Sequence, residues 1–308
     1  PIGKISNALP KEFRSRFVLT HFFNPPRYLR LVEIVPSSAS EKIVKSLISI
    51  IENMLGKGVV LAKDTPNFIA NRIGVHGQMV TLKLSEEMGL KVEEVDNIMG
   101  SIIGRPKSAV YRTLDIVGLD IAMMVAQNTY KNCPEDEERS LFSNETILNK
   151  LVEAGRLGQK SREGFYKKTG GEILSLDFET LEYTPQKEVR FDGYRLAKQQ
   201  NTTSGKIRAL AYSNDKAGKF FWEAMAQSFI YSANRIPEIS DEIIGIDNAM
   251  KWGFGYELGI FESWDAIGVK KSVNKMKGEG KNIPKWVEIM LDKGKESFYS
   301  QEKHRRTF

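Results

Sequence analysis

A histidine and a glutamate twelve residues apart are the side chains of this sequence best suited to acid–base chemistry. His21 lies in one apolar run, residues 17–23, and Glu33 lies in a second, residues 28–35, with two prolines between them. Both runs predict β-strands. If the strands fold back antiparallel about Arg27, the two side chains lie opposite each other and can touch. Paired in this way they have the make-up of a general base and the group that orients it. The alternatives are a core contact without function, or no contact.

The elements that must position this pair belong to an α/β region over residues 1–63. The sequence predicts a short helix from Lys4 to Leu9, an amphipathic helix over 40–55 and a short buried strand over 59–62. The run Asp64-Thr65-Pro66 marks the change to a helical region, since proline suits the first turn of a helix. A long helix is predicted over 67–88, with Asn71 on its opening turns.

The helical part of the sequence contains an internal repeat. Residues 92–99 match residues 243–250, and residues 115–119 match residues 265–269, at an offset of 150 to 151. A single long offset predicts two related helical domains, not a short-period solenoid. The second copy has Trp222 where the first has Asn71. The predicted divisions are the α/β region over 1–63, a first helical domain over 64–166, a linker with a little extended structure over 167–204 and a second helical domain over 205–308.

Four blocks occur in an order and at intervals that point to one family. They are His-Phe-Phe-Asn-Pro at 21–25, Leu-Val-Glu-Ile at 31–34, Asp-Thr-Pro-Asn-Phe-Ile-Ala-Asn-Arg at 64–72 and Gly-Arg-Leu-Gly-Gln-Lys-Ser-Arg-Glu-Gly-Phe-Tyr at 155–166. These blocks resemble the L-3-hydroxyacyl-CoA dehydrogenases, and the resemblance covers most of the chain. Residues 170–305 resemble the longer archaeal and bacterial members with two C-terminal helical repeats, often fused to an enoyl-CoA hydratase. Asn67 and Arg162 depart from the family, which usually has glycine at both positions.

The resemblance implies NAD-dependent oxidation of L-3-hydroxyacyl-CoA to 3-ketoacyl-CoA in fatty-acid β-oxidation. In that reading His21 is the base, Glu33 holds the tautomer of the ring, and Asn71 donates a hydrogen bond to the substrate oxygen. By the same matching, Asn24 faces the nicotinamide end of NAD and Lys160 reaches the cofactor from the helical domain. The alternatives are a turn-forming asparagine before proline for Asn24 and a plain surface lysine for Lys160.

The glycine turn that binds the pyrophosphate of NAD in Rossmann domains is missing from this sequence. No Gly-x-Gly-x-x-Gly occurs, and the nearest imitation, residues 253–259, has the wrong spacing and follows a helical pattern. We therefore expect the C-terminal portion of a larger enzyme, with an incomplete NAD site and no activity of its own. The expected fold is a mixed α/β remnant, the C-terminal part of a Rossmann-type domain, followed by two related all-α domains.

Composition narrows the class of protein further. The net charge is +6, but the basic residues alternate with acidic ones, which does not favour a nucleic-acid partner. No apolar run approaches the roughly 20 residues that span a bilayer. Cys133 is the only cysteine, which fits a reducing, cytoplasmic location. No spaced cluster of cysteine, histidine or carboxylate predicts a metal site, and His76 is predicted to point away from Asn71.

A second function class stays open beside the enzyme. The chain is expected to have a 3-hydroxyacyl-CoA or 3-ketoacyl-CoA substrate, to form a homodimer and to be fused to or associated with an enoyl-CoA hydratase. Alternatively, it is a non-catalytic helical assembly or dimerisation module of a multifunctional hydratase-dehydrogenase. The presence of His21, Glu33 and Asn71 together favours the enzyme.

Overall fold

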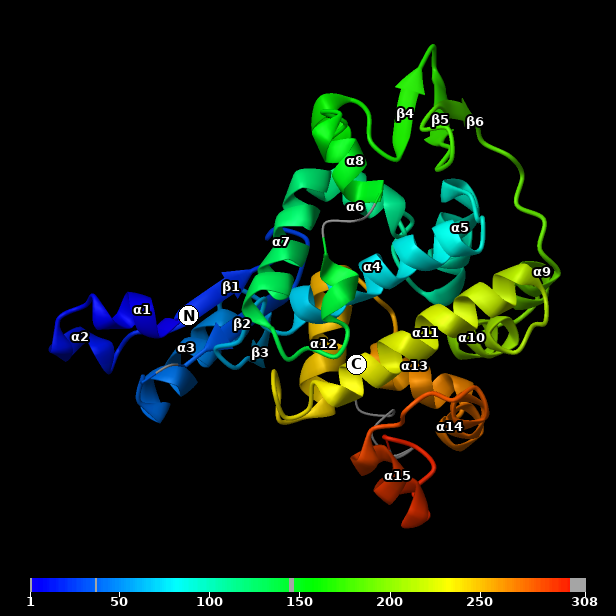
Figure 1. Ribbon diagram of the computed structural model, residues 1–308. Helices are drawn as coiled ribbons and strands as arrows, with labels where there is room; N and C mark the ends of the chain where they lie inside the picture. The colour runs from blue at the N-terminus through cyan, green and yellow to red at the C-terminus, as the bar shows by residue number, and fades with distance from the viewer. Residues whose placement is uncertain (1, 37, 144–146, 300–308) are drawn as a thin grey trace.

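A small α/β region and two helical regions follow one another along the chain. The computed structural model describes residues 2–36, 38–143 and 147–299, and Figure 1 shows the α/β region at one side of the helices. A second small sheet lies at the periphery of the helices, away from the first sheet (Figure 1). Within these described ranges, no helix is both long and apolar enough to cross a membrane.

The α/β region is built around a buried central strand. Its elements are α1 (Ile2–Asn7), α2 (Lys11–Arg14), β1 (Leu19–Phe22), β2 (Leu31–Val35), α3 (Glu41–Asn53) and β3 (Gly58–Leu61). The strand order is β1-β2-β3, with β1 antiparallel and β3 parallel to β2. All five residues of β2 are buried, as expected of a central strand with little polar sequence. The two strands, the helix and the short third strand predicted here are confirmed to within a few residues.

The first helical region carries the long helix that the sequence predicts. Its helices are α4 (Ala70–Glu87), α5 (Val92–Ile98), α6 (Tyr111–Val117), α7 (Leu119–Asn132) and α8 (Ile147–Glu153). Helix α4 begins at Ala70 and not at residue 67, because Asn67 and Phe68 have φ of 65° and 51°. Left-handed residues cannot continue into a right-handed helix, so the chain turns once more before α4 starts.

The segment predicted as a linker is more ordered than expected. It folds into an antiparallel sheet of β4 (Tyr166–Thr169), β5 (Glu172–Leu176) and β6 (Tyr183–Pro185), followed by α9 (Asp192–Lys198). The buried carboxylate of Glu93 on α5 holds this sheet, since it accepts hydrogen bonds from the Ser175 hydroxyl at 2.7 Å and the Lys187 backbone N–H at 3.0 Å. The Leu174–Leu176–Phe178 alternation was its only local signal.

The second helical region follows the same plan as the first. Its helices are α10 (Thr203–Ala211), α11 (Lys216–Asn234), α12 (Ile243–Phe254), α13 (Ile260–Ile267), α14 (Val269–Gly278) and α15 (Lys285–Asp292). Residues 243–250 of α12 match residues 92–99 at α5, so α12 corresponds to α5 in the repeat. Helix α11 then corresponds to α4.

Each helical region is organised by a pair of aspartates in the same way, and the first aspartate of each pair is Asp96 or Asp247. Asp96 accepts the backbone N–H of Tyr111 at 2.8 Å at the start of α6, and Asp247 accepts that of Phe261 at 2.8 Å at the start of α13. Burial raises the pKa of Asp96 to about 6 and that of Asp247 to about 7. The two regions therefore share a polar anchor in addition to an apolar pattern.

The second aspartate of each region binds a segment later in the chain, and a tyrosine of that segment contacts the first aspartate. Asp115 accepts the backbone N–H groups of Phe165 and Tyr166, and Asp265 accepts those of Phe298 and Tyr299. Each tyrosine then donates its hydroxyl to the first aspartate, at 2.9 Å in the first region and 2.8 Å in the second. The repeat read from the sequence thus extends to a matching hydrogen-bond network.

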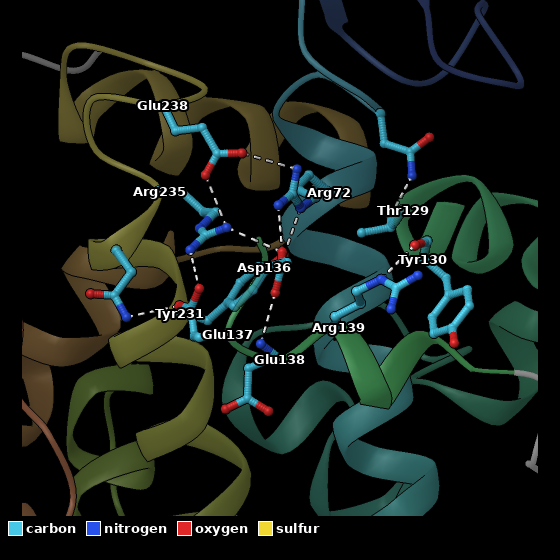
Figure 2. Close-up of polar contacts among 12 residues, drawn as sticks. Arg72, Thr129, Tyr130, Asp136, Glu137, Glu138, Arg139, Tyr231, Arg235 and Glu238 are labelled. Atoms are coloured by element: carbon cyan, nitrogen blue, oxygen red, sulfur yellow. Dashed lines mark hydrogen bonds and ion pairs between the residues drawn. The ribbon is translucent and has the colours of Figure 1, made fainter. Parts of the chain in front are cut away.

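Helices α4 and α11 pack side by side through a buried ionic cluster. Figure 2 shows Asp136 between Arg72 on α4 and Arg235 at the end of α11, where the two guanidinium groups bind the same carboxylate. Tyr231 on α11 accepts a hydrogen bond from Arg72 Nε at 2.6 Å and donates to Asp136 at 2.8 Å. Glu238 pairs with both arginines, at 3.3 Å and 2.9 Å. The charges of the cluster therefore compensate one another across the two helical regions.

Candidate active site

The histidine–glutamate pair forms as its register predicts. His21 on β1 is the direct partner of Glu33 on β2, and His21 Nδ1 lies 2.7 Å from Glu33 Oε2. The Glu33 side chain is fully buried, whereas 32% of the His21 side chain is exposed. Because a carboxylate accepts, the Nδ1–H of the ring donates to Glu33 and leaves Nε2 with its lone pair toward the open side. This arrangement is that of an oriented general base.

The second oxygen of Glu33 fixes the start of α4. Glu33 Oε1 accepts the backbone N–H of Ile69 at 3.1 Å and that of Ala70 at 2.8 Å. No side chain of α4's own sequence caps this helix, so the carboxylate from the sheet satisfies N–H groups that a helix start leaves unpaired. Hydrogen bonds from His21, Ile69 and Ala70 offset the free-energy cost of burying the Glu33 carboxylate. Glu33 therefore ties His21 to the helix turn that carries Asn71.

His21 and Asn71 lie where two clefts meet. The first, which we call the apolar cleft, has a volume of about 480 Å³ and is lined by His21, Phe22, Phe23, Asn24, Leu29, Asn71, Val75, Gln78, Pro106, Ser108, Thr113, Ile116, Val117, Ile121, Ala122, Val125, Gly253 and Phe254. The second, the polar cleft, has a volume of about 450 Å³ and is lined by Ile2, Ile5, Leu19, His21, Asp64, Thr65, Pro66, Asn67, Phe68, Asn71, Asn128 and Asn132. Only His21 and Asn71 belong to both linings.

The two predicted cofactor residues are placed differently. Asn24 lines the apolar cleft together with His21, and its side chain makes no hydrogen bond to the described part of the chain. Lys160 lines neither cleft. Its ammonium group lies 2.5 Å from Asp120 at the start of α7, and this hydrogen bond lowers the pKa of Asp120. The structure thus brings Asn24 to His21 and holds Lys160 in an ion pair away from it.

The two departures from the family pattern both occupy left-handed backbone. Asn67 has φ of 65° and Arg162 has φ of 66°, a conformation that glycine adopts without steric cost. Asparagine tolerates it better than most residues, and the Asn67 amide also donates to the Val125 carbonyl at 2.9 Å and the Thr129 hydroxyl at 2.7 Å. At both positions the family's usual glycine is therefore explained by the left-handed backbone conformation.

The remaining described histidine lies outside the site. His76 is buried and stacks on Tyr231, with ring centroids 3.7 Å apart and planes 3° from parallel. Burial lowers its pKa to about 3, so the ring is neutral at physiological pH. Among residues 2–36, 38–143 and 147–299, no group of histidine, cysteine and carboxylate side chains is arranged to hold a metal ion.

Two lining residues from the second helical region were missed by the sequence analysis. Gly253 and Phe254, at the end of α12, reach the apolar cleft although they lie 182 and 183 residues beyond Asn71 in the sequence. Their local signal was the glycine-rich run 253–259, which the sequence analysis weighed only as a nucleotide-binding turn. The glycine instead allows close approach: a Cβ at position 253 would lie 2.7 Å from the Leu31 side chain.

Two family models match the first half of the chain. Residues 1–65 match "3-hydroxyacyl-CoA dehydrogenase, NAD binding domain", and residues 68–168 match "3-hydroxyacyl-CoA dehydrogenase, C-terminal domain". The region that the sequence analysis described as a remnant is therefore, by this comparison, a match to the NAD-binding domain itself. The boundary between the two matches falls at the start of the turn that precedes α4.

Relatives match over about half of the chain or more. A probable 3-hydroxyacyl-CoA dehydrogenase of Bacillus subtilis is 49% identical over 302 residues, which are 98% of this chain and 38% of the relative. The human mitochondrial hydroxyacyl-coenzyme A dehydrogenase is 36% identical over 167 residues, 54% of this chain and 51% of the relative. A putative fatty acid oxidation complex trifunctional enzyme of Rickettsia prowazekii is 29% identical over 268 residues, 85% of this chain and 36% of the relative. The chain thus spans about a third to a half of the length of these relatives.

One solved structure has the same overall fold. The 3-hydroxybutyryl-CoA dehydrogenase of Escherichia coli matches with a TM-score of 0.67, covering 95% of this chain and 74% of that chain at 18% sequence identity. At this identity the likeness concerns the fold: an α/β region followed by helical regions in the same arrangement.

Proposed function

Since the chain belongs to the 3-hydroxyacyl-CoA dehydrogenase family, we propose that it supplies the acid–base half of a site that interconverts L-3-hydroxyacyl-CoA and 3-ketoacyl-CoA in fatty-acid β-oxidation. The observation that carries the proposal is the single buried carboxylate of Glu33, which hydrogen-bonds His21 and the turn that precedes Asn71. Bound NAD would accept the hydride. All other steps use residues of this chain.

The proton of the substrate hydroxyl goes to Nε2 of His21. Glu33 holds the Nδ1–H tautomer before this transfer and stabilises the imidazolium afterwards. Asn71 donates its amide N–H to the same oxygen, which gains carbonyl character as the proton leaves. In the reverse direction His21 returns the proton while the ketone is reduced.

The residues present fit one end of NAD. The Asn24 amide is open toward the apolar cleft beside His21 and suits the carboxamide of a nicotinamide. The 308 residues contain no Gly-x-Gly-x-x-Gly turn for the pyrophosphate, so we expect the chain alone to show no turnover. Lys160 remains a candidate cofactor contact only if its pair with Asp120 opens.

We further propose the division of the chain at the boundaries read from the sequence, with the matching aspartate networks as support for two related helical domains. The trifunctional name of the Rickettsia relative supports the proposal that an enoyl-CoA hydratase is fused to or associated with this protein. A homodimer is proposed on the family resemblance alone.

The test is an assay of the protein encoded by the complete reading frame. We expect it to oxidise NADH when acetoacetyl-CoA is added, and the His21→Ala variant to lose about 10²–10⁴-fold in kcat, the usual share of a positioned acid–base group. If the wild-type protein binds NADH and reduces no 3-ketoacyl-CoA of any length, the dehydrogenase proposal fails and the assembly-module alternative replaces it.

A further inference from the structure

The apolar cleft is walled by residues from both helical regions and the sheet. Its floor is one face of α4, where Asn71, Val75 and Gln78 recur at helical spacing. Phe22, Phe23 and Leu29 reach it from β1 and the loop that follows. Next to Phe23, Gly253 and Phe254 enter from the end of α12. The second helical region thus contributes directly to the cleft that holds His21.

Phe254 is fixed in this wall by close packing. Its ring lies against the backbone of α4 at Gly74, where an added Cβ would come within 2.1 Å of the ring. The ring centroid lies 6.1 Å from that of Phe23 and 6.0 Å from that of Tyr256. Backbone contacts hold the end of α12 as well: Arg30 N–H donates to the Trp252 carbonyl at 3.1 Å, and Glu257 N–H to the Gly104 carbonyl at 2.7 Å. The ring is therefore packed between α4, Phe23 and Tyr256.

This wall is one helical turn from the reacting position. Gly74 follows Asn71 by three residues on α4, a rise of about 4.5 Å along the axis. An apolar group attached to a carbon held at Asn71 and His21 would therefore meet Phe254 after a short path along α4.

The two clefts differ in the way the two arms of an acyl-CoA differ. The polar cleft offers Asp64, Thr65 and four asparagines, which suit the amides of a pantetheine arm. The apolar cleft offers aliphatic and aromatic side chains, which suit an acyl chain. Three of them, Ile116, Val117 and Ile121, are 55%, 50% and 41% exposed. Such a cluster of exposed apolar side chains beside a cleft is a common mark of a ligand site.

From these observations we infer that the acyl chain of the substrate lies in the apolar cleft and that Phe254, from the second helical region, limits the length of chain that fits. The inference rests on the proposed dehydrogenase function. It gives the second helical region a role in substrate choice, although Trp222 replaces the site asparagine there.

The experiment measures chain-length preference in the protein encoded by the complete reading frame. We would compare kcat/KM for NADH oxidation with 3-ketoacyl-CoA substrates of four and sixteen carbons. Phe254→Ala should raise the ratio of long-chain to short-chain kcat/KM by roughly tenfold or more, since even one methylene in an apolar pocket discriminates by about 10-fold or more. Phe254→Trp should lower the same ratio.

Calorimetric titration with 3-hydroxybutyryl-CoA and 3-hydroxyhexadecanoyl-CoA, without NAD, gives a readout that is independent of turnover. The ratio of the two dissociation constants should shift in the same directions. Leu258→Ala is the matched control, because it removes an apolar side chain of the same segment that does not line the cleft, and it should leave both ratios unchanged. If Phe254→Ala does not fold, Phe254→Leu and Phe254→Trp carry the test, with opposite shifts expected.

The outcomes separate this inference from the proposed function. An active wild-type protein whose chain-length ratios do not respond to any Phe254 variant overturns the role of Phe254 and leaves the dehydrogenase intact. A wild-type protein that reduces no 3-ketoacyl-CoA of either length overturns the proposed function, and the inference with it.

Discussion

Helices α4 and α11 occupy the same place in the two helical regions but begin in different ways. The first N–H groups of α4 donate to Glu33 of the sheet. Helix α11 instead has its own N-cap, Asp215, which accepts the N–H of Gly218 at 2.9 Å. Asp64, which precedes Asp215 by the repeat offset of 151 residues, instead accepts the backbone N–H of Ile2 at 3.0 Å. Helix α4, which has no N-cap side chain of its own, is therefore the one joined through Glu33 to His21.

The two helices also differ in the residue at one equivalent position near their starts, Asn71 in α4 and Trp222 in α11. Asn71 lies on α4 beside the sheet and lines both clefts. Trp222, its counterpart on α11, is 4% exposed and donates its indole N–H to Glu279 at 2.8 Å. The aspartate network recurs in both copies, whereas the proposed chemistry depends on α4, the helix whose start is hydrogen-bonded to Glu33 on β2. The comparison teaches that the fold repeats and the site does not.

The largest expected effect comes from changing the carboxylate that joins α4 to His21. Glu33→Gln leaves one carbonyl oxygen to face donors on two sides. If the amide NH₂ faces His21, the ring is forced into the tautomer whose Nε2 already carries a proton; if it faces α4, it opposes two backbone N–H groups. We expect kcat to fall by about 10³–10⁴-fold, as when the orienting carboxylate of a catalytic triad becomes an amide.

The matched control is Asp215→Asn in the second region. Asp215 likewise accepts from several donors, Gly193 N–H, Gly218 N–H and the Ser213 hydroxyl. This change should lower the free energy of unfolding by about 1–3 kcal/mol and leave kcat within about twofold of wild type, read at a temperature where both proteins are folded. Equal losses of kcat in the two variants would mean that Glu33 acts only on stability.

The next effect concerns the cluster that joins the two helices. Asp136→Asn removes the carboxylate between Arg72 and Arg235 (Figure 2) and leaves two buried guanidinium groups with less compensation. Urea unfolding should show a loss of about 3–5 kcal/mol, as for other broken buried ion pairs. The control is Glu41→Gln, since the pair of Glu41 with Lys45 is 72–80% exposed and should contribute less than about 1 kcal/mol. Similar losses of unfolding free energy in the two variants would mean that the buried cluster stabilises the protein no more than an exposed ion pair does.

A smaller, pH-dependent effect is expected at His76 in the same interface. Its pKa in the folded protein, about 3, lies below its ordinary value of 6.5 because the ring is buried. Between these two values the unfolded chain binds a proton that the folded protein does not, so stability is fully present above pH 6.5 and is lost as the pH falls. At pH 5 the loss amounts to about 2 kcal/mol.

His76→Phe keeps the stack on Tyr231 and removes this titration. Free energies of unfolding measured in urea at pH 7.5 and pH 5 should therefore fall less for the variant than for wild type, by about 2 kcal/mol. Identical pH dependence in the two proteins would show that His76 accepts a proton without unfolding.

One contact at the candidate site, between neighbouring strands, could be predicted from the sequence, and another, between the sheet and α4, could not. The register of β1 and β2 follows from two apolar runs about a short turn, so the contact of His21 with Glu33 could be inferred. The contact of Glu33 with Ile69 and Ala70 could not, because it depends on a turn whose left-handed residues, Asn67 and Phe68, do not show in an apolar pattern.

The same limit applies to the fold. The long helix over 67–88 and the repeat could be predicted from the sequence, whereas the segment that forms the sheet over 166–185 was predicted only as a linker with a little extended structure. Its strands are only partly buried and are held by Glu93 from α5, a contact between residues 82 positions apart. For the same reason, Phe254 could not be placed in the apolar cleft before the packing of α12 on β2 was known.

The most direct test of the division between the two copies is a pair of variants at equivalent positions. In the complete enzyme, Asn71→Ala should lower kcat for acetoacetyl-CoA reduction by about 10²–10³-fold, the usual cost of losing one donor to a reacting oxygen. Trp222→Phe, which keeps the ring packed and removes its hydrogen bond to Glu279, should leave kcat within about twofold of wild type. Similar kcat values for the two variants would contradict the claim that only the copy whose long helix starts on Glu33 carries the chemistry.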